Sequence, residues 1–236
     1  MKRYASIGLA VLIILAGWLV GNRLNGGNPP LADKAPKTDV TALSGPLPVG
    51  TGFDYYILSL SWSPSWCARN SAAADAKQCA DRRGMILHGL WPQNEQDYPE
   101  DCTSNEPERV PASLAGAYLD LIPSIGLIGH EWRKHGTCSG LSQRDYLATA
   151  RAAWETLTLP AALAGKSKDG RVAVSQIEDD FVRLNPGLTP RSIIVTCEDR
   201  MLEEVRICLT RDLKFRDCGN VERSACRLNQ VSIPTP

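Results

Sequence analysis

The sequence predicts an α+β fold with an antiparallel β-sheet core, several helices and disulfide bonds. Runs of β-branched and aromatic residues do not alternate regularly with amphipathic segments, as they would in a parallel α/β fold. Eight cysteines are spread along the chain, and no two of them form a C-x-x-C pair. The residues beyond position 50 are numerous enough to build one globular core.

The first 22 residues predict an export signal. Lys2 and Arg3 precede an almost unbroken apolar run from Ala5 to Val20. The run is long for a signal peptide and short for a spanning helix, and it lacks a clean A-x-A cleavage site, so a signal peptide and a retained membrane anchor both fit. We therefore expect a periplasmic or secreted protein, with the anchored form as the alternative.

Two further boundaries follow from composition. Residues 23–50 are rich in Gly, Pro and Ala without an apolar period, which predicts a flexible linker. Residues 51–236 then form the folded domain.

Four stretches predict β-strands. Residues 55–62 (YYILSLSW) predict a buried strand that ends in a loop. A short strand at 85–87 is expected to give way to a loop at His88. The β-branched runs at 192–197 and 205–209 predict a hairpin or meander, and the C-terminal segment is expected to be strand and loop.

Four segments predict helices. Residues 111–121, 142–157 and 176–184 show helical spacing of apolar positions. A further helix is expected to follow Gly129 and to stop at Gly136.

Charge by itself points to no polyanionic partner. The chain has 26 basic and 26 acidic residues, and residues 51–236 carry a net charge of −3. A basic surface would favour binding to phosphates by counterion release. Any interaction with nucleic acid must therefore depend on a local site.

The cysteines indicate a disulfide framework. Zinc knuckles and thioredoxin-like sites are disfavoured, since both need C-x-x-C pairs. An even number of cysteines spread over the domain is typical of four disulfides formed in an oxidising compartment. Buried free thiols are the alternative, and the residues alone leave the pairing open.

The only three histidines fall in two short segments, HGLWP at 88–92 and HEWRKHGTC at 130–138. The second has the spacing H-E-x-x-x-H, which separates the two imidazoles by roughly 140° around a helix. Zinc proteases use H-E-x-x-H, so that class is disfavoured.

On a helix, the second segment places His130 beside Lys134 and Glu131 beside His135, and it leaves Trp132 free to pack. Two imidazoles, a lysine and a glutamate without a Ser or Cys nucleophile suit phosphodiester transfer, in which the 2′-hydroxyl of RNA attacks. One neutral imidazole takes the 2′-OH proton, an imidazolium protonates the leaving 5′-oxygen, and a cation stabilises the phosphorane. No metal and no cofactor is needed.

The position of Glu131 adds an electrostatic expectation. A carboxylate one helical turn from His135 favours the imidazolium and would raise the pKa of this histidine. We therefore expect activity to fall in acid and a bell-shaped pH profile.

The two histidine segments resemble the active-site signatures of the ribonuclease T2 family. The resemblance extends from about Phe53 to Cys226 and includes the strand at 55–62, Trp66-Cys67 and Tyr98-Pro99. It implies a ribonuclease T2-like fold and an endonuclease that cleaves single-stranded RNA through 2′,3′-cyclic phosphates to 3′-phosphate ends. Broad base specificity, no cleavage of DNA and a monomeric state are also implied.

The resemblance further implies roles for seven site residues. His135 resembles the general base and His88 the general acid, Glu131 and Lys134 the transition-state stabilisers, His130 a phosphate-binding residue, and Trp91 and Tyr98 the residues that hold the base. Ordinary packing is the alternative for Trp91 and Tyr98.

Two departures from the family pattern leave the base preference open. Ser61 stands where many relatives carry glutamine, and Gln93 where an acidic residue or asparagine is common.

The resemblance also implies a disulfide pattern. The implied pairs are Cys102 with Cys138, Cys197 with Cys226, Cys208 with Cys218, and, as the remainder, Cys67 with Cys79.

Two other functions compete with this one. A non-catalytic secreted RNA-binding module could use the same fold. A metal-dependent phosphatase or nuclease would need a cluster of carboxylates and histidines, which the sequence does not show outside the Glu131 helix.

Overall fold

The computed structural model describes residues 45–73, 76–163, 170–219 and 224–236. The predicted signal or anchor at 1–22 and most of the predicted linker lie outside the described residues. Within the described ranges, no helix combines the length and apolar character needed to cross a membrane.

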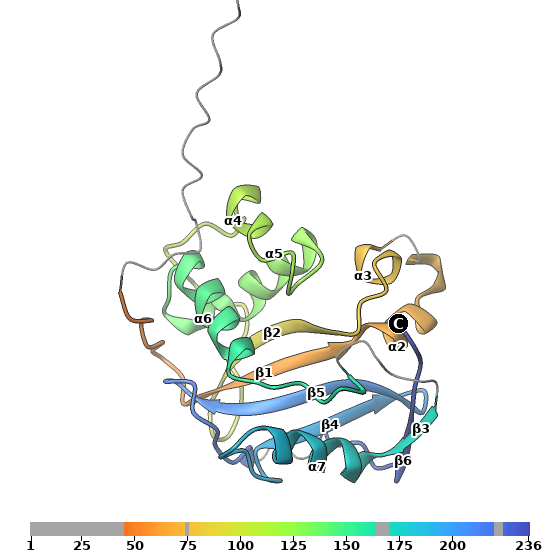
Figure 1. Cartoon of the computed structure of the whole chain (residues 1–236). Helices are drawn as coiled ribbons and strands as arrows, with labels where there is room; N and C mark the ends of the chain where they lie inside the picture. Colours follow the sequence, from red (N-terminus) through yellow and green to blue (C-terminus); the bar gives the residue numbers. More distant parts are fainter. Residues whose placement is uncertain (1–44, 74–75, 164–169, 220–223) are drawn as a thin grey trace, which may run out of the picture. The chain divides into compact units, whose positions relative to one another are not determined.

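A six-stranded sheet forms the centre of the domain (Figure 1), in the order β2-β1-β5-β6-β3, with β4 also paired to β5. The ladders are antiparallel, except for a single parallel pairing of Met201 with Ser232 between β5 and β6. The predicted α+β class is therefore confirmed. The strands are β1 Tyr55–Trp62, β2 Met85–Gln93, β3 Gly170–Ala173, β4 Ile193–Glu198, β5 Met201–Thr210 and β6 Gln230–Ile233.

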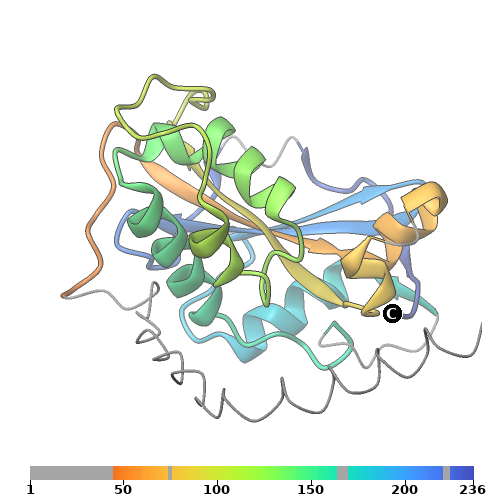
Figure 2. The ribbon, with the colours of Figure 1, turned by 90° about the horizontal axis from the view of Figure 1, so that it is seen from above.

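The helices lie beside different strands of this sheet. Figures 1 and 2 show that α5 and α6 lie beside β2, whereas α7 lies beside β4. The helices predicted at 142–157 and 176–184 are confirmed as α6 and α7. The α-helices are α2 Ser63–Arg69, α3 Lys77–Ala80, α4 Ala112–Gly116, α5 Ile125–Lys134, α6 Gln143–Glu155 and α7 Val174–Leu184, and the 3₁₀ turns are η1 Ser71–Ala73 and η2 Gly136–Ser139.

Two local predictions were wrong. The segment 111–121 is a helix only over α4, and bonds such as Tyr118 N–H to Ala115 O (3.0 Å) close it into tighter turns. The strand β1 does not end in a loop, because α2 begins at once with Pro64 in its first turn. Proline is well suited to that position, since the first helical N–H groups lack an acceptor within the helix.

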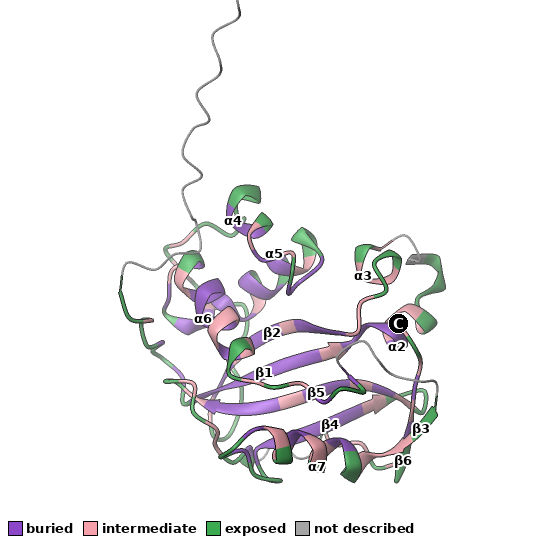
Figure 3. Ribbon diagram, viewed as in Figure 1, coloured by how far each residue is buried: buried purple, intermediate pink, exposed green. Residues whose placement is uncertain are grey.

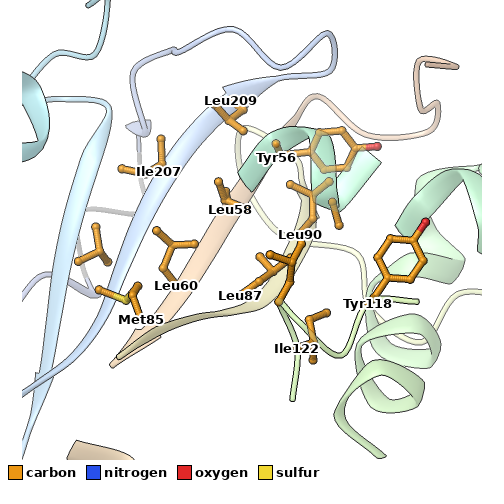
Figure 4. Packing of buried hydrophobic residues seen from close by; sticks show 14 of the residues in the cluster. Tyr56, Leu58, Leu60, Met85, Leu87, Leu90, Tyr118, Ile122, Ile207 and Leu209 are labelled. Carbon is orange, nitrogen blue, oxygen red and sulfur yellow. The ribbon is translucent and has the colours of Figure 1, made fainter. Parts of the chain in front are cut away.

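The two faces of the sheet bury different clusters. Tyr56, Leu58 and Leu60 alternate along β1 into the main core, which Figure 4 shows closed by residues of β2 and β5 and of the segment after α4. Tyr55 and Ile57 point to the other face and join a smaller cluster. Figure 3 shows that β1 and β5 are mostly buried.

All four disulfides implied by the family resemblance are present, so this prediction is confirmed. No described cysteine is free. The pairs are Cys67–Cys79, Cys102–Cys138, Cys197–Cys226 and Cys208–Cys218.

Candidate active site

One cavity of about 520 Å³ brings the predicted site residues together. It lies over the face of β1, β2 and β5 that points away from the main core, and α5 and the residues after β2 flank it. The seven predicted residues that line it are His88, Trp91, Tyr98, His130, Glu131, Lys134 and His135.

A β-bulge in β2 aims two of these side chains into the cavity. The register between β1 and β2 shifts between Ser59 and Leu60, which leaves His88 as an extra residue without a partner on β1. Side chains alternate along a regular strand, so without the bulge His88 and Trp91, three positions apart, would face opposite sides. With the bulge, both line the cavity. The expected loop at His88 was therefore wrong, since this histidine lies inside a nine-residue strand.

The helix α5 supplies the second group of site residues. It begins at Ile125, earlier than expected, because the hydroxyl of Ser124 caps it by accepting a hydrogen bond from Leu127 N–H at 3.2 Å. Trp132 is fully buried and donates its indole N–H to Pro107 O at 2.9 Å, which confirms its packing role. The helix ends at Lys134, and His135 is its C-terminal cap.

Glu131 contacts the residues of β2 and not His135. Its buried carboxylate accepts a hydrogen bond from Trp91 Nε1 at 2.7 Å and lies 3.5 Å from His88 Nε2. Burial raises the pKa of Glu131, although the charge of His88 and the bond from Trp91 partly offset this. The expected electrostatic pairing of Glu131 with His135 was therefore wrong.

His135 is buried in surroundings that favour its neutral form. Its ring stacks on Trp91, with centroids 5.1 Å apart. Burial, followed by the positive charges of Lys134, His88 and His130, lowers the pKa of His135 to about 3. The expected rise of this pKa is contradicted, because proximity along one helix does not decide where the carboxylate points.

His88 is held by a residue that the sequence reasoning missed. Its Nδ1 lies 2.5 Å from Oε1 of Glu204 on β5, across the intervening strand β1. Burial by itself lowers the pKa of His88, but the hydrogen bond with Glu204 and the charge of Glu131 outweigh it, so the pKa is raised.

Glu204 belongs to an ion pair with Arg206, two residues further along β5. Nη2 of Arg206 lies 2.7 Å from Oε2 of Glu204, and the guanidinium lies over the Trp91 ring, 5.1 Å from its centroid. Two opposite charges spaced i, i+2 in an apolar strand share one face. That spacing is the signal that could have found them.

The remaining predicted residues lie at the rim. Lys134 Nζ is 3.4 Å from Glu100 Oε2, and both residues line the cavity. His130 and Tyr98 are exposed, with Tyr98 at 61 %. Across the described ranges, no three His, Cys, Asp or Glu side chains are grouped so that they could hold a metal ion.

Comparisons with known proteins show which family this chain resembles. A model of the Ribonuclease T2 family matches residues 53–218. A ribonuclease from Aeromonas hydrophila is 50% identical over 94 residues, 40% of this chain and 41% of that protein. A probable ribonuclease from Haemophilus influenzae is 36% identical over 121 residues, 45% of this chain and 44% of that protein. The matches thus span less than half the length of these two relatives.

The fold also has solved counterparts. An RNase-related protein from Calystegia sepium aligns with a TM-score of 0.61 at 20% identity, over 78% of this chain and 98% of that one. At this identity the likeness concerns the fold.

Proposed function

Because this chain belongs to the ribonuclease T2 family, we propose that it is an endoribonuclease that cleaves single-stranded RNA without a metal ion or cofactor. The observation that carries the proposal is the pair His88 and His135 in one cavity, with pKa values shifted in opposite directions. Such a pair provides an acid and a base at the same pH.

The proposed reaction assigns the base to His135 and the acid to His88. Neutral His135 takes the proton of the 2′-hydroxyl as its oxygen attacks phosphorus. The P–O5′ bond breaks, and protonated His88 gives its proton to the departing oxygen. The product is a 2′,3′-cyclic phosphate, which water opens to a 3′-phosphate as the two histidines exchange roles.

The other cavity residues have supporting roles in this proposal. Lys134 stabilises the negative phosphorane, and Glu131 holds the Trp91 indole and the His88 ring on one side of it. His130 contacts a phosphate at the exposed rim. The base rests against Trp91, with Tyr98 on the other side, and the base preference is broad.

We also propose the arrangement of the whole chain. Residues 51–236 form the catalytic domain, residues 23–50 a linker, and residues 1–22 a signal peptide or membrane anchor that sends the monomeric enzyme to the periplasm or outside the cell. The four disulfides support an oxidising compartment.

The deciding experiment incubates the purified protein with single-stranded RNA and DNA in excess EDTA, next to the variants His88→Ala and His135→Ala. We expect only RNA to be cut, with cyclic phosphate ends, and a loss of about 10²–10⁴-fold in kcat for each variant. RNA binding without turnover would favour the non-catalytic module. Cleavage that needs metal would favour the metal-dependent nuclease.

A further inference from the structure

The two ring nitrogens of His88 have different partners. Nδ1 lies 2.5 Å from Oε1 of Glu204, whereas Nε2 lies on the side of Glu131, 3.5 Å from its carboxylate. Because an ionised carboxylate can only accept, Nδ1 must carry a proton and donate it to Glu204. Nε2 is then the nitrogen that gains and loses the catalytic proton.

Glu204 is itself held from several directions. Its side chain is only 5% exposed, and Oε2 accepts a hydrogen bond from Arg206 Nε at 2.8 Å. Ser61 Oγ donates to Oε1 at 3.3 Å, and the backbone N–H of Glu204 donates to Thr196 Oγ1 at 3.2 Å. Although burial opposes ionisation, His88 and Arg206 hold the pKa of Glu204 at about 2, so this carboxylate is charged.

We propose that Glu204, held by Arg206, is a positioning residue that fixes the tautomer and ring orientation of His88 for protonating the leaving 5′-oxygen. This inference rests on the proposed function. It assigns a role to an ion pair on β5, outside both histidine segments.

The geometry explains how the pair would act. When the P–O5′ bond breaks, the proton on Nε2 of His88 moves to the oxygen, and Nδ1 keeps its proton. Glu204 stabilises the imidazolium before transfer without taking a proton itself. Arg206 keeps the carboxylate ionised and prevents its rotation away from the ring, since it binds the other oxygen.

The test compares Glu204→Gln with Glu203→Gln, which changes the neighbouring carboxylate on the same strand. Two substrates are used, an RNA dinucleotide and an analogue whose 5′-nucleoside is replaced by 4-nitrophenolate. Nitrophenolate leaves without a proton, so the analogue bypasses the general acid. On RNA, we expect Glu204→Gln to lower kcat by about tenfold to hundredfold, which is part of what a whole general acid contributes. On the analogue, kcat should change little.

A second readout does not depend on turnover. The three imidazoles can be titrated by NMR with ¹⁵N-labelled histidine, and Glu204→Gln should lower the pKa of His88 while Glu203→Gln leaves it unchanged. An equal loss on both substrates, or an unchanged titration of His88, would overturn the positioning role. If the wild-type protein does not cut RNA at all, the proposed function fails, and the titration still tests the contact.

A second feature lies apart from this cavity and supports an independent inference. Another cavity, of about 510 Å³, is lined by Arg171 on β3, Arg200 in the turn between β4 and β5, and Arg227. Its other lining residues are uncharged. None of the three arginines forms an ion pair or side-chain hydrogen bond with a residue in the described ranges.

The backbone holds these three positive charges together. The disulfide Cys197–Cys226 ties the segment carrying Arg227 to the end of β4. Arg200 O accepts a hydrogen bond from Ser232 N–H at 2.9 Å, and Arg171 is the register partner of Ser232 across the β3–β6 ladder. Like charges kept close repel one another, and no carboxylate of the described residues is paired with these three, so a bound anion would relieve this repulsion.

We infer that this three-arginine cavity binds phosphate groups of the RNA backbone at a distance from the cleavage site. The inference rests on the proposed function, because RNA is the polyanion that such an enzyme meets. Guanidinium groups match phosphate oxygens in geometry. Arg206 lies six residues beyond Arg200, about 20 Å along a strand at ~3.4 Å per residue, so several nucleotides are needed to reach both sites.

The test uses 2′-O-methyl RNA of about 20 nucleotides, which cannot be cleaved. In anisotropy titrations at several salt concentrations, we expect replacement of the three arginines by alanine to weaken binding. The slope of log K against log[salt] should become shallower by about 0.7 for each phosphate that the variant no longer binds. Cleavage of a dinucleotide should not change. The matched control replaces three ion-paired surface cations elsewhere, Arg183, Arg191 and Lys214.

Two outcomes would overturn this inference. One is an unchanged affinity and salt slope in the triple variant. The other is a loss of binding to phosphatidylglycerol vesicles without any effect on RNA, which would assign the cavity to a membrane surface. Because the RNA in this test is never cut, a failure of the proposed chemistry would be seen separately.

Discussion

The pKa values of the two histidines proposed as acid and base are shifted in opposite directions, and this sets the pH range of the proposed reaction. Catalysis needs neutral His135, hence a pH above its lowered pKa of about 3, and protonated His88, hence a pH below its raised pKa. The profile of kcat/KM should thus be flat through mildly acidic pH and fall on the alkaline side. An acidic limb with a midpoint near pH 6 would contradict this assignment.

Trp91 has contacts that indicate a wider role than stacking on the base. It donates to Glu131, stacks on His135 and lies under Arg206, in addition to lining the cavity. We expect Trp91→Ala to lower kcat as well as raise KM in steady-state assays, because these contacts hold both histidine segments. Trp91→Phe keeps an aromatic ring, so its kcat and KM should lie between those of the wild type and those of Trp91→Ala. A rise in KM alone would indicate that Trp91 serves only to stack on the base.

At the scale of the element, the β2 bulge leaves room for only a glycine after His88. A Cβ at Gly89 would overlap the Glu131 carboxylate and lie 2.5 Å from Trp91 Nε1. We expect Gly89→Ala to lower the free energy of unfolding by about 1–3 kcal/mol, measured by thermal denaturation. The activity should fall further than the smaller fraction of folded protein explains.

The matched control for this change is Gly116→Ala. A Cβ at Gly116, the last residue of α4, would meet nothing within 4 Å. Its activity should stay at the wild-type level. If Gly89→Ala were equally active, the close approach of Glu131 to β2 would not matter for catalysis.

At the scale of the whole molecule, one disulfide connects the fold to the site. Cys138 follows His135 by three residues, and Asp101 N–H, next to Cys102, donates to Lys134 O at 2.8 Å. Removing Cys102–Cys138, which spans 36 residues, should lower the free energy of unfolding by about 4 kcal/mol. Removing Cys67–Cys79, which spans 12 residues, should lower it by about 3 kcal/mol.

Double Cys→Ser variants, compared by calorimetry and by assay below the melting temperature, test this difference. Loss of Cys102–Cys138 should also reduce activity in the folded protein, because it frees the end of α5. Loss of Cys67–Cys79 should affect stability alone. Equal activity in both folded variants would contradict a link between this disulfide and the site.

Local sequence was sufficient for the parts of the protein that depend on near neighbours. The strand at 55–62 follows from its dense run of apolar and aromatic residues, and it is buried on both faces. The helix α6 follows from the helical spacing of its apolar residues, which indicates the face that is buried. The two histidine segments identified six of the residues that line the cavity, and through the family resemblance they also implied the four disulfides.

The tertiary structure decided which of those residues touch. Glu131 and His135 are one helical turn apart in sequence, yet the carboxylate turns to β2 because the indole of Trp91 donates to it there. The bulge at His88 and the partner Glu204, which is 116 residues away, arise only when β1, β2 and β5 pair. A pKa depends on burial and on charges brought together by the whole fold, so the sequence could suggest which histidines act as acid and base but could not determine their pKa values.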